Sequence, residues 1–289
     1  MAAKRKGEFA HLGVIDALNW GLVVYDEVHL LPAPVFQLTA QLQARRRLGL
    51  TATLVREDGR EGDVFSLIGP KRFDVPWKQL EAQGYIAPAS CVEIRLDLPP
   101  TERLDYAAST DQERFRLAST TPSKATLVKE LLALHPDDPT LIIGTYVDQI
   151  EHLSDSLDIP MITGQTSIAE RERLYDEFRT GALMRLVVSK VANFSIDLPE
   201  ASVAIQVSGS FGSRQEEAQR LGRILRPKAD GRPAVFYTLV ARDTVDQDFA
   251  LNRQRFLAEQ GYGYTIMDAA EVTQKIPAML SEKVQLPHR

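Results

Sequence analysis

The sequence has few of the residues and segments that mark several common classes of protein. Its 289 residues include one cysteine, Cys91, which cannot form an intrachain disulfide, so we expect a cytoplasmic protein in a reducing compartment. No apolar run approaches the roughly 18 residues of a membrane-spanning helix, and the N-terminus has no signal-peptide core. No Cys/His spacing suggests a zinc site. These absences argue against a secreted, membrane-bound or zinc-stabilised protein.

An excess of positive charge is also missing. The formal net charge is −5, so any surface that binds nucleic acid must be a local basic patch. The composition, 44% hydrophobic and 25% charged, is ordinary for a globular protein. The length allows two domains with separate cores.

Two adjacent carboxylates, Asp26 and Glu27, follow an apolar run at residues 22–25. The run shows no alternation, which predicts a strand buried on both faces of a parallel sheet. In open α/β sheets, ligands bind outside the carboxyl ends of the strands. Nucleoside-triphosphate hydrolysis needs such a pair: one carboxylate holds Mg²⁺, directly or through water, and the next polarises the attacking water. Taken alone, the pattern is equally typical of a turn or of the start of a helix.

Two further segments bear on this choice. Residues 48–53, Leu-Gly-Leu-Thr-Ala-Thr, form a second apolar segment that ends in hydroxyl residues, and residues 219–226 read Gln-Arg-Leu-Gly-Arg-Ile-Leu-Arg. With the Asp-Glu-Val-His sequence at 26–29, their order resembles motifs II, III and VI of superfamily 2 helicases. The continuation at residues 51–59, with Arg-Glu-Asp directly after the third motif, is similar to the XPB (xeroderma pigmentosum group B) family of DNA helicases. Residues 65–71, 196–201 and 212–218 are similar to that family too.

This resemblance implies an ATP-dependent 3′-to-5′ DNA helicase that uses Mg²⁺ and works in DNA repair or transcription. Its partners would be DNA, as a single strand or a fork, and a repair nuclease or other repair proteins, with no membrane. The implied fold is α/β, with RecA-like lobes built on parallel sheets. We expect residues 1–88 to form part of a first lobe, with motifs II and III and the Arg-Glu-Asp element. Residues 89–289 would form a complete second lobe, with motifs IV, V and VI.

The resemblance also assigns roles to residues. Asp26 would hold Mg²⁺ through water, Glu27 would activate water, and Gln219 would face His29 or that water and couple the lobes. Arg223 and Arg226, three apart on one helical face, would act as arginine fingers on the γ-phosphoryl group, although an isolated pair of this kind usually forms surface salt bridges. The resemblance further implies that Asp197 contacts the nucleotide and that Thr51 and Thr53 contact DNA. It implies that Arg56, Glu57 and Asp58 separate the duplex, although the residues of this last segment taken alone indicate a solvated loop.

One element of such a motor is missing from the sequence. No glycine begins a G-x-x-x-x-G-K-[ST] phosphate loop, and about twenty residues precede the Asp26 strand, too few for the usual strand, loop and crossover helix. We therefore expect a C-terminal portion of a motor that is cut inside its first lobe. Two alternatives stay open: a non-hydrolysing module that binds DNA or a partner, and another superfamily 2 translocase such as a restriction subunit.

The pattern of apolar residues predicts the remaining elements. After a helix-and-loop crossover at 30–47, we expect strands at 91–98, 140–144, 161–163, 185–188, 203–207, 234–240 and 261–266, the last at a sheet edge. Expected helices cover 78–86, part of 101–121, then 124–134, 147–157, 167–181, 215–225 and 244–259. The tail after Lys275 is expected to be frayed.

Overall fold

The computed structural model describes residues 4–5, 8–9, 18–30, 42–51, 61–189, 201–209, 213–224 and 233–284. The chain divides into two compact units, Met1–Asp74 and Val75–Arg289. None of the helices in the described ranges is long and apolar enough to cross a membrane.

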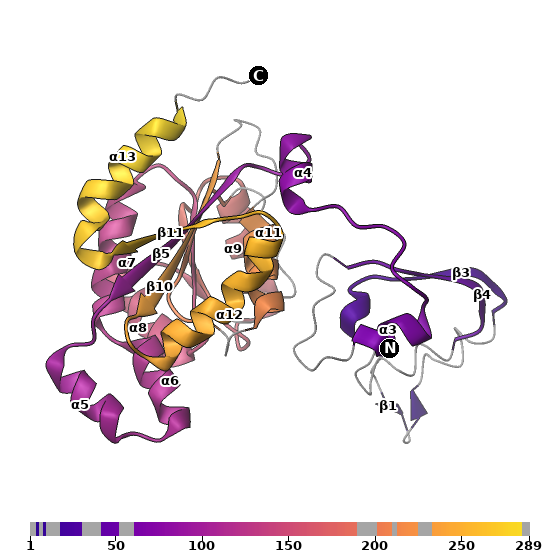
Figure 1. The fold of residues 1–289 in the computed structure, drawn as a ribbon, viewed down its shortest axis with the longest axis horizontal. Helices are drawn as coiled ribbons and strands as arrows, with labels where there is room; N and C mark the ends of the chain where they lie inside the picture. The colour runs from indigo at the N-terminus through magenta and orange to yellow at the C-terminus, as the bar shows by residue number, and fades with distance from the viewer. Residues whose placement is uncertain are drawn as a thin grey trace. The chain divides into compact units, whose positions relative to one another are not determined.

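The second unit is built on a parallel sheet, which confirms the predicted fold class. Seven described strands pair in parallel in the order β11-β5-β10-β9-β6-β8-β7 (Figure 1). Their bounds are β5 Ala89–Leu96, β6 Thr140–Ile143, β7 Met161–Ile162, β8 Arg185–Val188, β9 Val203–Gln206, β10 Ala234–Ala241 and β11 Tyr264–Asp268. β11 lies at the edge, as predicted. β10 is buried along its whole length and mostly apolar, which is typical of a strand covered on both faces.

Helices cover both faces of this sheet. Figure 1 shows α7 and α13 on one side and α11 and α12 on the other. The core under α7, α8 and α13 includes Leu131, Ile150 and Ile276, while α6, α11 and α12 contact β10 on the second face. The helix bounds are α4 Trp77–Ala82, α5 Pro100–Ala108, α6 Asp111–Thr120, α7 Ser123–Leu134, α8 Val147–Leu157, α9 Ile168–Arg179, α11 Arg214–Ile224, α12 Val245–Glu259 and α13 Val272–Val284, with a 3₁₀ turn, η2, at Ala269–Glu271.

A side-chain hydrogen bond and a glycine explain where α9 begins and ends. Ser167 Oγ accepts a hydrogen bond from the Glu170 N–H at 3.2 Å, which is one half of a capping box, while the Glu170 carboxylate pairs with Arg173. The helix stops before Gly181, whose φ of +77° is the left-handed conformation that favours glycine.

Two predictions about helices need correction. Residues 101–121 contain parts of two helices, α5 and α6, where one was expected. The expected fraying after Lys275 is wrong for the described residues, because α13 continues to Val284. Val272 and Ile276 on α13 are fully buried in the core, and this packing holds the segment to the sheet.

The first unit has a small parallel sheet of its own. β3 (Trp20–Tyr25) pairs with β4 (Ala44–Gly49), the turn η1 (Val28–Leu30) follows β3, and helix α3 (Glu61–Leu67) follows β4. Two short strands, β1 (Lys4–Arg5) and β2 (Glu8–Phe9), form a separate antiparallel pair. The core contains Tyr25, Val28 and Val64.

The prediction that β3 is buried on both faces is wrong for the described part of the unit. Leu22 and Val24 are 51% and 49% exposed, because the described neighbours of β3 cover the face that carries Val23 and Tyr25. β4 also begins earlier than expected and includes the three arginines at 45–47. Arg47 has a structural role, since its guanidinium donates to the Leu42 and Leu67 carbonyls at 3.1 Å each.

The boundary between the two compact units lies before α4. The sequence analysis predicted a lobe boundary later in the chain, between residues 88 and 89. α4 packs with the second unit: the Trp77 N–H donates to Gln260 Oε1 at 3.2 Å, and the Trp77 ring contacts the edge of the Tyr262 ring. The division describes packing, so the lobe boundary itself stays a prediction.

Candidate functional site

The acidic pair predicted from the sequence lies in a tight turn at the carboxyl end of β3. Asp26 is exposed, and its Oδ1 accepts a hydrogen bond from the Glu27 N–H at 2.9 Å. Glu27 has a φ of +50°, in the left-handed region that residues other than glycine rarely adopt. Such conformations cost free energy and are concentrated at functional sites.

Two backbone hydrogen bonds place this turn beside the end of β4. The Leu50 N–H donates to the Tyr25 carbonyl at 2.8 Å, and the Val28 N–H donates to the Leu50 carbonyl at 3.0 Å. Glycine at position 49 permits this approach, because a Cβ there would lie 2.8 Å from Val28 Cγ2. The acidic turn and the threonine segment after β4 therefore form one local structure.

His29 connects the two segments through its side chain. The ring is fully buried, and its Nδ1 lies 2.8 Å from Thr51 Oγ1 and 3.4 Å from Glu27 Oε2. The Glu27 carboxylate and the Thr51 hydroxyl thus approach the same ring nitrogen, and the shorter distance is to Thr51. Because one nitrogen serves both oxygens, a closer contact with Glu27 would weaken the contact with Thr51.

The acidic turn fits a Mg²⁺ ion that is held largely by water. Among the residues that the structure describes, no group of three or more His, Cys, Asp or Glu side chains could bind a metal directly. Mg²⁺ in phosphate-binding sites usually keeps several waters and takes one or two carboxylates plus phosphate oxygens. Asp26, exposed at the carboxyl end of a parallel strand, can be one such ligand.

The second predicted set lies on α11 of the second unit. Gln219 is half-buried, and its Oε1 has no hydrogen-bond partner among the described residues. Arg223 follows one turn later, on the same side of the helix, and its side chain is outside the described part. Gly222, between them, faces the Trp77 ring.

The remaining predicted site residues lie outside the described residues. These are Thr53, Arg56, Glu57, Asp58, Asp197 and Arg226. Their roles stay predictions.

The sequence did not reveal a group of buried charges beside α11. Asp246 and Arg253 on α12 are 0% and 1% exposed, and Glu217 and Arg220 on α11 are buried equally deeply. A signal was present in α12: Asp246 and Arg253 are seven residues apart, on the helical face that also carries Ala250 and Leu257, both fully buried.

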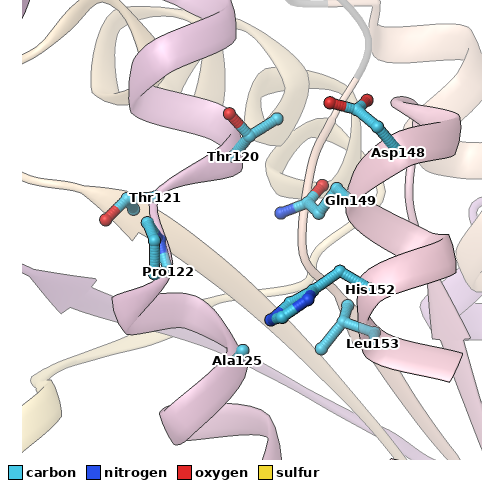
Figure 2. Close-up of a pocket in the computed structure, with 8 residues that line it drawn as sticks. All are labelled: Thr120, Thr121, Pro122, Ala125, Asp148, Gln149, His152 and Leu153. Carbon is cyan, nitrogen blue, oxygen red and sulfur yellow. The ribbon is translucent and has the colours of Figure 1, made fainter. Parts of the chain in front are cut away.

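A surface cavity of about 290 Å³ lies between the α6–α7 junction and α8 (Figure 2). Two of its polar residues already have partners, because Asp148 pairs with Arg116 and Gln149 Nε2 donates to the Ser119 carbonyl. None of the predicted site residues lines it, and we assign it no role. The lining residues are Thr120, Thr121, Pro122, Ala125, Asp148, Gln149, His152 and Leu153.

Comparison with known proteins identifies the family. Residues 80–286 match the family described as ERCC3/RAD25/XPB C-terminal helicase. The chain is 66% identical over 277 residues to a DNA 3′-5′ helicase XPB of Kineococcus radiotolerans, an alignment that covers 96% of this chain and 50% of that protein. It is 64% identical over 269 residues to a protein of the same name from Mycobacterium tuberculosis, covering 93% of this chain and 49% of that one.

The chain thus spans about half the length of these curated relatives. Among solved structures, S. cerevisiae Dbp5 bound to RNA and ADP BeF3 is similar in fold, with a TM-score of 0.61 and 14% identity over 93% of this chain and 65% of that one. On the family match and the two relatives, the chain belongs to the ERCC3/RAD25/XPB C-terminal helicase family.

Proposed function

We propose that this chain is the motor region of an ATP-dependent 3′-to-5′ DNA helicase or translocase of the XPB type, acting in DNA repair or transcription. The observation that carries the proposal is the contact of His29 with both Glu27 and Thr51. It joins an acidic turn suited to phosphate chemistry to the segment that the family resemblance assigns to DNA. A motor needs such a connection, because hydrolysis must be coupled to movement on the strand.

The acidic turn would carry out the chemistry. Mg²⁺, when bound, neutralises charge on the ATP phosphates. Asp26 would hold that ion through water, and Glu27 would orient and polarise the attacking water. The Glu27 carboxylate lies near His29 Nδ1, which also contacts Thr51, so the proton-accepting group and the DNA-linked hydroxyl share one partner.

Side chains of the second unit would complete the site in the full-length protein. Gln219 would bind the attacking water or His29, which gives its unpartnered Oε1 a ligand. Arg223 and Arg226 would stabilise charge on the transferring γ-phosphoryl group, and Asp197 would contact the nucleotide. Thr53 would act with Thr51 on DNA.

DNA, as a single strand or a fork, is the proposed nucleic-acid partner, and Arg56, Glu57 and Asp58 would separate its strands. A repair nuclease or another repair protein is the proposed protein partner. The cytoplasmic location expected from the single cysteine stays a prediction.

Strand displacement by the full-length protein tests the proposal. With ATP and Mg²⁺, we expect release of the labelled strand from a duplex with a 3′ single-stranded tail and little release from a matched duplex with a 5′ tail. A non-hydrolysable ATP analogue is the control and should support neither reaction. Equal release from both substrates would contradict the polarity, and release without hydrolysis would contradict the motor.

A further inference from the structure

Five charged side chains are buried around the end of β9, and we call them the buried clamp. Each is at most 1% exposed, and they come from three helices: α7, α11 and α12. Burying a charge is costly unless it is paired and hydrogen-bonded, so a group of this size needs internal compensation. The five residues are Lys124, Glu217, Arg220, Asp246 and Arg253.

The three cations of the clamp hold the backbone of residues 207–209. Lys124 Nζ donates to the Val207 carbonyl at 2.9 Å, and Arg220 Nη1 donates to the Ser208 carbonyl at 3.3 Å. The guanidinium of Arg253 lies against Gly209, where a Cβ would overlap Arg253 Cζ. This segment leads from the sheet toward α11, so its position bears on where that helix begins.

The two carboxylates link these cations to one another. Asp246 Oδ2 accepts from Lys124 Nζ at 2.9 Å and from the Ala241 N–H at 3.2 Å. Glu217 Oε2 accepts from Gln206 Nε2 at 2.8 Å. Arg253 lies between them, with Nε 3.7 Å from Glu217 Oε2 and Nη2 3.7 Å from Asp246 Oδ1.

Arg253 is therefore the residue that joins α11 to α12 within the clamp. The burial of Lys124 lowers its pKa, and the neighbouring Asp246 carboxylate opposes that effect, so the charges depend on one another. Removing one member of a buried ionic group leaves its partners uncompensated and strongly disfavoured. The ion pairs of the clamp connect the three helices that supply it, Lys124 with Asp246 and Arg253 with both Asp246 and Glu217.

The clamp also determines which way the opposite face of α11 points. Successive helical residues turn by about 100°, so Gln219 points away from Glu217, two positions earlier, while Arg223 shares the side of Gln219. Anchoring Glu217 and Arg220 in the clamp fixes the rotation of the helix about its own axis. That rotation sets where Gln219 is directed and which side of the helix carries position 223.

We propose that Arg253 is a positioning residue: through the buried clamp it holds α11 in the orientation that Gln219 and Arg223 need for ATP hydrolysis. This inference rests on the proposed function. Arg253 touches neither nucleotide nor metal in this account, and it acts through Glu217 and the backbone at Gly209.

Gly209→Ala tests the proposal without changing any charge. No left-handed backbone requires glycine at this position, so alanine is permitted there, but its Cβ forces the Arg253 guanidinium to move. In the full-length protein we expect kcat for DNA-stimulated ATP hydrolysis to fall by about 10- to 100-fold, since small misplacements of catalytic groups have effects of this size. KM for ATP should stay within about twofold. Arg253→Met should act in the same direction.

Tyr237→Phe is the matched control. It removes a buried hydrogen bond of 2.8 Å to His135 Nε2, in the core shared with α7 and α13, on the face of the sheet away from α11. We expect it to lower thermal stability and leave kcat near that of the wild type. If Arg253→Met does not fold, Arg253→Lys keeps the charge but loses the planar guanidinium, and its kcat should also fall.

Hydrogen exchange of the same full-length proteins gives a second readout that does not depend on activity. Gly209→Ala should lose amide protection in α11 and keep it in β6. A folded Gly209→Ala protein with wild-type kcat, or with unchanged α11 protection, would overturn the positioning role. A wild-type protein without DNA-stimulated hydrolysis would instead overturn the proposed function, and the exchange data would still decide the role of the clamp.

Discussion

Glu27→Gln in the full-length protein should lower ATP turnover by about 10²- to 10⁴-fold while nucleotide binding is kept, because positioned proton acceptors contribute rate enhancements of this size. Glutamine has nearly the same shape, so the turn and the contact near His29 can persist. It has no carboxylate with which to polarise water. The loss should therefore appear in kcat.

Parallel measurements of ATP hydrolysis and of binding of a fluorescent nucleotide check this expectation. Glu102→Gln, the same change on the partly exposed carboxylate in the first turn of α5, is the matched control and should behave like the wild type. A Glu27→Gln protein that keeps more than about a tenth of wild-type turnover would show that Glu27 does not act on the attacking water.

Arg223→Ala and Arg226→Ala should each lower turnover of the full-length protein by about 10³-fold or more, the range measured for arginine fingers. A finger acts on charge that develops in the transition state, so its loss lowers kcat with little change in nucleotide affinity.

Steady-state kinetics with varied ATP separate the two constants. Arg179→Ala is a suitable control, because Arg179 is an exposed arginine near the end of α9 that pairs with Asp176. If either variant of the pair mainly raised KM, that arginine would bind ground-state phosphate and the finger assignment would be wrong.

Much of the second unit could be predicted from the sequence because its strands are short, apolar and bounded by turn residues. Residues 140–143 are buried throughout, and α7 and α8 occupy nearly the predicted ranges. The burial of residues on β5 is harder to predict from the sequence. The alternating pattern of this strand predicts one polar face, yet Glu93 is fully buried, because Arg95 and Gln254 both pair with its carboxylate. Arg95 is a neighbour on the same strand, but Gln254 comes from α12, and a local pattern does not reveal that contact.

Part of the candidate site was equally accessible to sequence reasoning. The order of the motifs predicted Asp26, Glu27, His29 and Thr51 as site residues, but the spacing does not reveal that one imidazole nitrogen lies near both Glu27 and the Thr51 hydroxyl. That contact depends on the close approach of β4 at Gly49.

The buried clamp escaped prediction for a related reason. A charged helix such as α12 is usually solvated on its charged face, and only the tertiary structure brings Glu217 and Lys124 to Arg253 and Asp246. The exposure of one side of β3 also depends on tertiary packing, which a local sequence pattern does not show.

Phosphate release, measured with and without single-stranded DNA for the full-length protein and for residues 1–289 in parallel, tests the central claim most directly. In motors of this kind, nucleotide affinity comes largely from the amides and lysine of a glycine-rich loop, and the 289 residues contain no such sequence. We expect DNA-stimulated release by the full-length protein and no release above background by residues 1–289. A DNA-dependent rate from residues 1–289 that Glu27→Gln removes would contradict the account.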